Sequence, residues 1–427
     1  MNALEELFAQ KKTENGDDAY NTTGNHLIDL LFMSEYYGKH LDEVKIGTSD
    51  KEKLFAMFMR DGRFGLGRRD LGRELMNQAE VSPEFIVKAG RFDDLLFNNT
   101  FNAIKYLKEQ VLKGNELAKK WCPRLTCKDK KIAKFLCKVW GVSEKEYRKL
   151  IKTDTTENKL SHHRIDEIEF EKVPSLAMIK YTNRFKKEER FLEYLESVKK
   201  GEKKINMATS TIYDIYKNRK NIDADMYFDK LEKIKINCIP VLDTSGSMED
   251  LDDSLGKATC IAHYLAKCST FCNGQVVSFS SRPQLLTIDG NAKKTYGRYG
   301  NENNYCRELN SLYTGDCSNT DFGKVMELFA DLKEVPEYLV VLSDMEFDYG
   351  SRTSKEETMK LFKEKGYKTK IIWWNFNNRN TTVPEIDKYG NIYMSGYTPQ
   401  MLKFLQAGFN AEQFLDKLLE EYAKNLK

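Results

Sequence analysis

Oxygen-bearing side chains occupy alternate positions directly after an apolar run in the second half of the chain. Asp243, Ser245 and Ser247 stand in the segment Asp-Thr-Ser-Gly-Ser that follows the run at 236–242. Hard cations prefer oxygen ligands, and Mg²⁺ keeps several of its waters when a protein binds it. One carboxylate and two hydroxyls supply oxygens without filling the coordination shell. The spacing therefore predicts a site for Mg²⁺ or Mn²⁺ that stays open to a further ligand.

Two more oxygen ligands are expected from separate segments. Thr320 precedes a helical pattern, and Asp344 ends the apolar run at 337–344. Ligand sites of open parallel sheets lie at the carboxyl ends of the strands, so these segments should converge with the Asp243 loop. An acidic side chain or a phosphate from a partner would complete the coordination, which is a binding chemistry. The alternative is that these residues only cap helices or form a strand-to-helix turn.

The elements that must position these residues follow from the apolar pattern after about residue 235. Runs at 236–243, 274–281, 337–344 and 368–376 are short and lack polar alternation, as expected for strands buried on both faces of a parallel sheet. Helical patterns alternate with them at 254–268, 321–332, 354–366, 399–406 and 412–424. This alternation predicts a doubly wound parallel sheet with helices on both faces.

The chain from about residue 20 to 230 has helical periodicity instead. Apolar residues recur at helical spacing in 26–37, 51–60, 100–112, 130–140 and 189–198. Short breaks separate these segments, and at one of them Ser82 can cap a helix that Pro83 opens. We therefore expect an N-terminal segment 1–20, an all-helical, HEAT-like repeat domain at 21–234 and an α/β domain at 235–427, an α plus α/β fold overall.

A basic region lies within the helical half. Residues 101–150 hold 14 basic and 5 acidic side chains, which would attract a polyanion such as RNA. The candidate phosphate-binding residues are Lys119, Lys120, Arg124, Lys131, Lys134, Lys145, Arg148, Lys149 and Lys152. Trp121, Phe135, Trp140 and Tyr147 are interleaved with them, and exposed aromatic rings can stack on unpaired bases. The alternative is a solvated lysine face with aromatic residues in the core.

A second candidate anion site combines arginines with glycines. It comprises Arg60, Arg63, Arg68 and Arg69, with glycines at 62, 65 and 67. Glycine lets the backbone approach an anion, and arginine binds phosphate in a bidentate manner. Equally, the glycines can turn one helix into the next, with Arg69 paired to Asp70 or Glu74.

The metal segments resemble a known domain. IPVLDTSGSM, SNTDFGKV and EYLVVLSDMEFD are similar to the metal-ion-dependent adhesion site of von Willebrand factor A (vWA) domains. The resemblance covers about residues 235–427 and fills all five expected ligand positions. It implies a vWA fold in which the ion binds a ligand.

The helical half resembles the TROVE region of Ro autoantigen proteins, and more closely a family that joins such a region to a C-terminal vWA domain. The similar segments are TENGDDAYNTTGNHLIDLLF, RDGRFGLGRRDLGREL, KAGRFDDLLF, KKWCPR, GVSEKEYRKLI, FEKVPSLAMIKY and, in the second half, IIWWNFNNRN. Ro proteins are rings of helical repeats that bind small RNAs. The resemblance implies a similar RNA role, although this helical half is shorter than that of Ro proteins.

Other classes lack sequence support. No apolar run reaches the roughly 18 residues of a membrane helix, and the first residues are not a signal peptide. The chain has nine cysteines, and an odd number argues against a framework of disulfides. We therefore expect a protein of the cytosol or nucleus, and take the cytoplasm as its location. The spacing of Cys122, Cys127 and Cys137 does not fit zinc, and His162 and His163 diverge in any regular element. No catalytic or nucleotide-hydrolysis motif occurs.

The leading hypothesis is a non-catalytic RNA-binding protein with a separate vWA metal site, and no DNA or membrane partner. The first alternative is an adaptor that uses the metal site to capture an acidic residue of a protein partner, without RNA. A metal-dependent hydrolase is the third.

Overall fold

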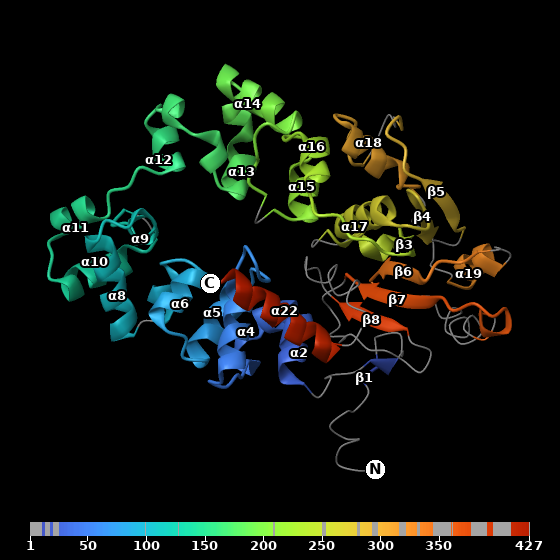
Figure 1. The fold of residues 1–427 in the computed structure, drawn as a ribbon, viewed down its shortest axis with the longest axis horizontal. Coiled ribbons are helices and arrows are strands. Elements are labelled where there is room, and N and C mark those ends of the chain that lie inside the picture. The colour runs from blue at the N-terminus through green and yellow to red at the C-terminus, as the bar shows by residue number, and fades with distance from the viewer. Residues whose placement is uncertain are drawn as a thin grey trace, which may run out of the picture. The chain divides into compact units, whose positions relative to one another are not determined.

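The computed structural model describes residues 11–12, 18–19, 25–98, 100–126, 128–207, 210–249, 253–279, 282–292, 298–315, 322–330, 334–344, 360, 362–376, 391–395 and 411–426. Figure 1 labels the helices and strands, and the chain divides into two compact units. The sheet unit comprises residues 1–36, 179–189 and 210–415, and the helical unit comprises 37–178, 190–209 and 416–427. Each is described by itself.

The helical unit is built from short helices with strong local end signals. They are α4 (Asp50–Arg60), α5 (Arg69–Gln78), α6 (Pro83–Ala89), α7 (Asp94–Asn98), α8 (Phe101–Leu112), α9 (Glu116–Trp121), α10 (Lys130–Trp140), α11 (Glu144–Leu150) and α12 (Thr156–Ser161), with 3₁₀ turns Leu41–Glu43, Ile165–Glu167 and Phe170–Lys172. Ser49 and Ser143 each close a capping box at the start of their helices. Gly141 ends α10 in the left-handed conformation.

Four helices have residues in both units: α3 (Ser34–Lys39), α13 (Ser175–Phe185), α14 (Glu189–Lys199) and α22 (Ala411–Asn425). The last part of α22 packs within the helical unit. The ring of Tyr422 lies edge-on to that of Phe58, with 5.5 Å between centroids, and its hydroxyl donates to Asp61 over 3.1 Å. At the surface, Lys51 pairs with Asp416 at 2.7 Å. The C-terminal residues thus complete the core around α4.

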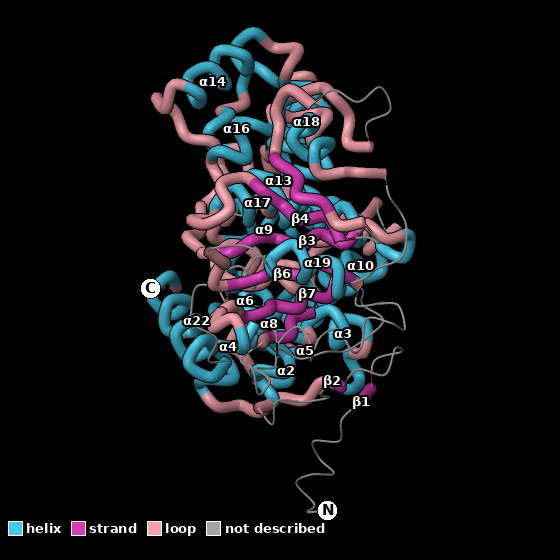
Figure 2. The backbone as a smooth tube through the Cα atoms, turned by 90° about the vertical axis from the view of Figure 1, so that its right-hand side faces the viewer, coloured by secondary structure: helices cyan, strands magenta, loops and turns pink. Residues whose placement is uncertain are grey.

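The sheet unit holds a six-stranded sheet in the order β5-β4-β3-β6-β7-β8, and Figure 2 labels its four central strands. Its strands are β3 (Cys238–Asp243), β4 (Gln275–Phe279), β5 (Gln284–Thr287), β6 (Tyr338–Ser343), β7 (Lys370–Asn375) and β8 (Ile392–Ser395). All neighbours pair in parallel except β4 and β5, which are antiparallel. Every residue of β3 and of β6 is buried, as parallel strands covered on both faces require.

Helices and turns complete the sheet unit. They are α2 (His26–Phe32), α15 (Ile212–Asn218), α16 (Ala224–Asp229), the 3₁₀ turn η4 (Gly246–Met248), α17 (Ser254–Cys268), α18 (Asn304–Ser311) and α19 (Phe322–Ala330), with a separate pair of two-residue strands, β1 (Lys11–Lys12) and β2 (Asp18–Ala19). Helix α17 packs on β3, β4 and β6, and α19 packs on β4.

A helical first half and an α/β second half, expected from the two periodicities, are both observed. All four expected strands form, and the helix expected at 254–268 begins and ends at those residues. The expectation of a purely parallel sheet misses the antiparallel edge strand β5. The helical pattern at 399–406 lies outside the described residues. In the described part of the chain, no helix combines the length and the apolar character needed to span a membrane.

Candidate functional site

Asp243 and Asp344 lie at the point of the sheet where the connections between strands change direction. From β3 the chain continues outward to β4 and β5, whereas the later strands β7 and β8 extend from β6 on the other side. Ligands of open α/β sheets bind in the crevice beyond the carboxyl ends of the strands at such a switch point. Asp243 is the last residue of β3, and Asp344 directly follows β6, its parallel neighbour. The topology therefore brings these two predicted residues to the place where a ligand is expected.

Both carboxylates are buried, and Asp243 is held by its neighbours. Asp243 is 0% exposed and Asp344 is 1% exposed. The backbone amide of Ser245 donates to Asp243 Oδ1 over 2.9 Å, and the hydroxyl of Ser343 donates to Oδ2 over 2.5 Å. These bonds fix the orientation of the carboxylate before any ligand arrives.

The electrostatics of this pair favour a cation. Burial and the nearby Asp344 together raise the pKa of Asp243 to about 7, against the opposing effect of the Ser343 and Ser245 hydrogen bonds. Two like charges in a low-dielectric site are costly unless a positive charge compensates them. A divalent ion would supply that charge.

The serines of the loop add neutral oxygens next to these carboxylates. The hydroxyl oxygens of Ser245 and Ser247 lie 3.0 Å apart, close enough to act together. The 3₁₀ turn Gly246–Met248 and the fully buried side chain of Met248 anchor the loop. Thr320, the fifth predicted ligand, lies outside the described residues.

These donors fit a hard cation. The residues brought together offer two carboxylates and two hydroxyls, with neither sulfur nor imidazole, which suits Mg²⁺ or Mn²⁺. No cluster of three or more His, Cys, Asp or Glu side chains suited to a metal occurs in the described ranges. At the segment considered for zinc, burial raises the pKa of the Cys122 thiol to about 12, and Cys127 lies outside the described residues.

The basic residues of α10, α11 and the turn after them lie largely at the surface. Lys131, Lys145, Lys149 and Lys152 are exposed, and none of them forms an ion pair with the described residues. Lys134 and Arg148 are also exposed and share Glu144, at 3.5 and 3.6 Å. Exposed ion pairs of this kind are weak, so both cations remain available to another anion. We call these six residues the basic surface.

The remaining basic candidates of this region contact the protein itself. Lys119 pairs with Glu116 at 2.7 Å, and Lys120 with Glu157 at 3.5 Å. The guanidinium of Arg124 donates to the carbonyl of Ile151 over 2.8 Å. The Lys119 pair lies within α9, whereas the contacts of Lys120 and Arg124 tie α9 and its following turn to neighbouring segments.

The aromatic candidates differ in their exposure. Phe135 is exposed on α10 between the lysines. Trp140 and Tyr147 are buried, with their ring centroids 5.5 Å apart, and the Tyr147 hydroxyl donates to the carbonyl of Pro123 over 3.1 Å. The interpretation of these two as base-stacking residues is wrong, because they join α10 to α11 in the core. On α10 the helical period separates Trp140 from Phe135, because Trp140 shares the buried face of Leu136 and Cys137 and Phe135 does not.

The glycines of the arginine-glycine segment serve helix packing. A Cβ on Gly72 would lie 2.5 Å from the Cα of Arg60, and one on Gly65 would lie 1.9 Å from the carbonyl oxygen of Phe58. Gly67 has a φ of +69°. The segment therefore turns α4 tightly into α5, as one of the two sequence interpretations had it.

The arginines of this segment differ in exposure. Arg60 is buried against Asp94 at 2.8 Å. Arg69 is exposed and pairs with Asp93 at 3.1 Å, so the expected pairing with Asp70 or Glu74 is wrong, because the turn before α7 brings a carboxylate from farther along the chain. Arg63 is exposed and Arg68 is half-buried.

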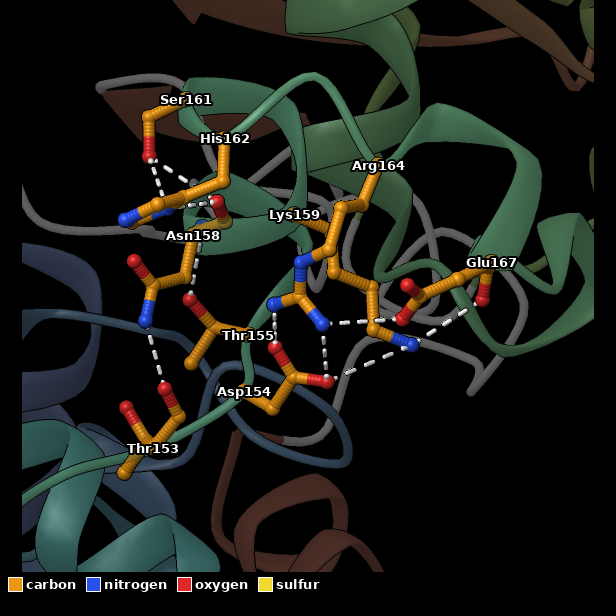
Figure 3. Close-up of polar contacts among 9 residues, drawn as sticks. All are labelled: Thr153, Asp154, Thr155, Asn158, Lys159, Ser161, His162, Arg164 and Glu167. Atoms are coloured by element: carbon orange, nitrogen blue, oxygen red, sulfur yellow. Dashed lines mark hydrogen bonds and ion pairs between the residues drawn. The ribbon is translucent and has the colours of Figure 1, made fainter.

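His162, the first of the tandem histidines, lies at the end of α12 in the polar network of Figure 3. Both Ser161 Oγ and His162 Nδ1 contact the carbonyl of Asn158, at 2.9 and 2.8 Å. Because a carbonyl only accepts, this His162 nitrogen carries its proton and is no base for Ser161. Next to it, Arg164 pairs with Asp154 and Glu167. The network ties the turn after α12 together.

Sequence reasoning missed Ser343, which donates the shortest bond to Asp243. The signal was present, since Ser343 is a polar residue directly before Asp344 at the end of an apolar strand. Its role depends on strand register, because Leu242 pairs with Leu342 and thereby places Ser343 opposite Asp243.

Comparisons with known proteins relate both parts of the chain to others. Residues 237–425 match a family model described as a domain of unknown function, DUF7788, and residues 143–239 match another, DUF2828. The chain is 23% identical to the uncharacterized protein L728 of Acanthamoeba polyphaga mimivirus, over 97% of this chain and 88% of that protein. The crystal structure of the Deinococcus radiodurans Ro (RSR) protein is similar with a TM-score of 0.41 and 10% identity, over 94% of this chain and 95% of that one.

Proposed function

We propose that the sheet unit is a vWA-type domain that binds Mg²⁺ or Mn²⁺ at the switch point of its sheet and, through the ion, an anionic group of a ligand. Asp243, Ser245 and Ser247 would hold the ion together with Asp344, with Thr320 as the expected fifth ligand. The ion would supply positive charge to an acidic side chain or a phosphate. The role is binding, without catalysis.

One observation carries this proposal. Two buried carboxylates end or follow adjacent parallel strands, next to a pair of serine hydroxyls. If these residues were only helix caps, burial of both carboxylates without a cation would be a standing cost to stability. A ligand-free structural role therefore explains the serines but not the two aspartates.

Isothermal titration calorimetry with Mg²⁺ and Mn²⁺ tests the proposal. Wild-type protein is expected to bind one ion, and Asp243→Asn should weaken binding by at least about 100-fold, since a charged ligand is lost. Asp289→Asn removes an exposed carboxylate of the same unit and serves as the charge-matched control. Wild type that takes up no ion at millimolar metal, or equal affinity of both variants, would overturn the proposal.

A second function, RNA binding by the helical unit, is favoured by a separate observation. The basic surface presents six exposed cations, α10 also carries the exposed ring of Phe135, and Glu144 is the only described carboxylate paired with any of the six. Phosphate contacts would give affinity independent of sequence, with Phe135 stacking on an unpaired base. The test is a gel-shift assay with total cellular RNA at two salt concentrations, in which binding must fall steeply as salt rises.

If the protein binds metal but no RNA, the adaptor hypothesis takes its place. The ion would then capture an acidic residue of a protein partner, and the helical unit would act as a scaffold. Crosslinking of the intact protein followed by sequencing of bound RNA separates the two.

A further inference from the structure

Four arginines of the helical unit converge on two adjacent aspartates at the start of α7. We call this group the arginine cluster; it comprises Arg60, Arg69, Arg73, Arg91, Asp93 and Asp94. Its members come from α4, α5 and the turn between α6 and α7. The cluster has an inner and an outer layer, and the two layers differ in composition and in access to solvent.

The inner layer is a closed structural contact. Asp94 is buried and pairs with Arg60 at 2.8 Å and with Arg73 at 2.5 Å. It also accepts from the backbone amide of Arg91 over 2.8 Å. Both carboxylate oxygens are therefore used, and this layer fixes α4, α5 and α7 to one another.

The outer layer has more donors than acceptors. A single oxygen, Asp93 Oδ2, accepts from Arg69, Arg73 and Arg91 at 3.1, 2.9 and 3.1 Å. The side chains of Arg69 and Arg91 are 52% and 30% exposed, so this layer opens to solvent. Each guanidinium carries five N–H donors, far more than one carboxylate can satisfy.

The cluster also has an excess of positive charge. Four guanidiniums face two carboxylates, which leaves two charges uncompensated. Burial lowers the pKa of Arg91, and repulsion from Arg69 and Arg60 adds to this effect against the attraction of Asp93. Within the described residues, the buried atoms Arg91 Nε and Asp93 Oδ1 have no hydrogen-bond partner. A further anion at the exposed side of the outer layer would relieve the repulsion between the guanidiniums.

An aromatic ring orients one of the open arginines. The guanidinium of Arg91 lies over the ring of Trp121, 3.9 Å from its centroid. Stacking on an aromatic face holds the planar guanidinium in place and reduces the entropy lost when it binds a ligand.

We propose that the outer layer of the arginine cluster binds a phosphate group, with Arg69 and Arg91 as its ligands and Trp121 as the residue that positions Arg91. Guanidinium pairs match the oxygens of phosphate in a bidentate manner, whereas a lone carboxylate such as Asp93 fills only part of that geometry. The phosphate is that of an RNA backbone, a step that rests on the second proposed function. Free phosphate is the other source of the same chemistry.

Two probes separate these sources in the full-length protein. Fluorescence anisotropy measures binding of a labelled single-stranded oligouridylate, and calorimetry measures binding of inorganic pyrophosphate. The double substitution Arg69→Gln with Arg91→Gln should weaken both about 5- to 30-fold and flatten the salt slope for the oligonucleotide by about 1.4. Lys88→Gln removes an exposed cation of α6 and, as the control, should change either affinity less than about 2-fold.

Asp93→Asn distinguishes a binding site from a structural network. Removing this carboxylate takes away the internal competitor and adds positive charge, so phosphate should bind about 3- to 10-fold more tightly. A purely structural network would lose thermal stability without gaining affinity. Circular dichroism checks that each variant is folded.

Each outcome decides a different claim. Loss of both affinities in the double variant, with a gain in Asp93→Asn, supports the site and its RNA ligand. Loss for pyrophosphate alone supports the phosphate site and overturns its assignment to RNA. If wild type binds no RNA at all, the proposed RNA function fails while the pyrophosphate arm still tests the cluster. Unchanged affinities for both probes in the double variant overturn the proposal.

Discussion

The edge of the sheet at Asp243 and the basic surface of α10 and α11 would bind an anion in two different ways, the first through a metal ion and the second directly. At the sheet edge, two carboxylates are buried at the ends of adjacent strands and Asp243 is oriented by hydrogen bonds. On the basic surface, the cations are exposed and weakly paired. The first arrangement needs an ion of defined size and charge, whereas the second attracts any polyanion and responds to salt. A preorganised site selects one kind of ligand, whereas an exposed charged surface can bind many polyanions.

Replacing Asp243 by asparagine should have the largest effect on stability. The pKa of Asp243 in the folded, metal-free protein lies near 7, above its ordinary 3.8. Because the pKa is raised, protonated Asp243 stabilises the folded protein fully below about pH 4, and this stabilisation is lost as the pH rises through 7. Without metal at pH 8, the free energy of unfolding of Asp243→Asn should exceed that of wild type by about 1–4 kcal/mol, because the buried charge is gone. Asparagine keeps an oxygen that accepts from the Ser245 amide.

Thermal unfolding in chelator and in Mg²⁺, at pH 6 and pH 8, measures this effect. Magnesium should restore the stability of wild type at pH 8 and leave the variant unchanged. A variant less stable than wild type in chelator at pH 8 would show that the buried carboxylate stabilises the fold by itself, which removes the argument for a cation.

Neutralising the basic surface should act on RNA alone. Changing Lys131, Lys134, Arg148 and Lys152 together to glutamine should weaken RNA binding about 10- to 100-fold at low salt and flatten the salt slope by up to about 3. Filter binding at several salt concentrations measures both. Asp243→Asn should leave this affinity unchanged. Loss of RNA in the Asp243 variant alone would mean that the ion contacts phosphate and that the two regions share one task.

Removing the Ser343 hydroxyl should weaken metal binding at the edge of the sheet. This hydroxyl lowers the pKa of Asp243, so Ser343→Ala should raise that pKa further above 7. Because the ion competes with the proton, Mg²⁺ affinity should fall about 3- to 10-fold at pH 7 and recover largely by pH 9. Equal losses at both pH values would mean that Ser343 acts on the metal by another route.

The smallest effect is expected in the core of the helical unit. Tyr422→Phe removes a buried hydrogen bond to Asp61 and should lower the free energy of unfolding by about 1–2 kcal/mol. Chemical denaturation with and without Mg²⁺ provides the measurement. The loss should be the same in both, and a loss that Mg²⁺ abolishes would contradict the assignment of this contact to the helical unit alone.

The sequence predicted elements best where the apolar pattern was strong. The four buried strands and the helix at 254–268 formed as expected, and Asp243 and Asp344 follow from their positions at strand ends. Strand β5 was missed because most of its residues are exposed and it has no apolar run. Side-chain partners distant in sequence were also missed, such as Asp94 for Arg60, because periodicity carries no information about which helices meet.

Crystals grown with Mn²⁺ provide the most direct test of the metal site, through the anomalous scattering of the ion. We expect one strong anomalous peak at this loop, within about 2.0–2.4 Å of the Ser245 and Ser247 hydroxyls, with Asp243 either bound to the ion directly or hydrogen-bonded to a water of its coordination shell. The peak should vanish in crystals of Asp243→Asn grown in the same way. A wild-type map at saturating Mn²⁺ with no peak at this loop, or with its peak elsewhere, would contradict the account.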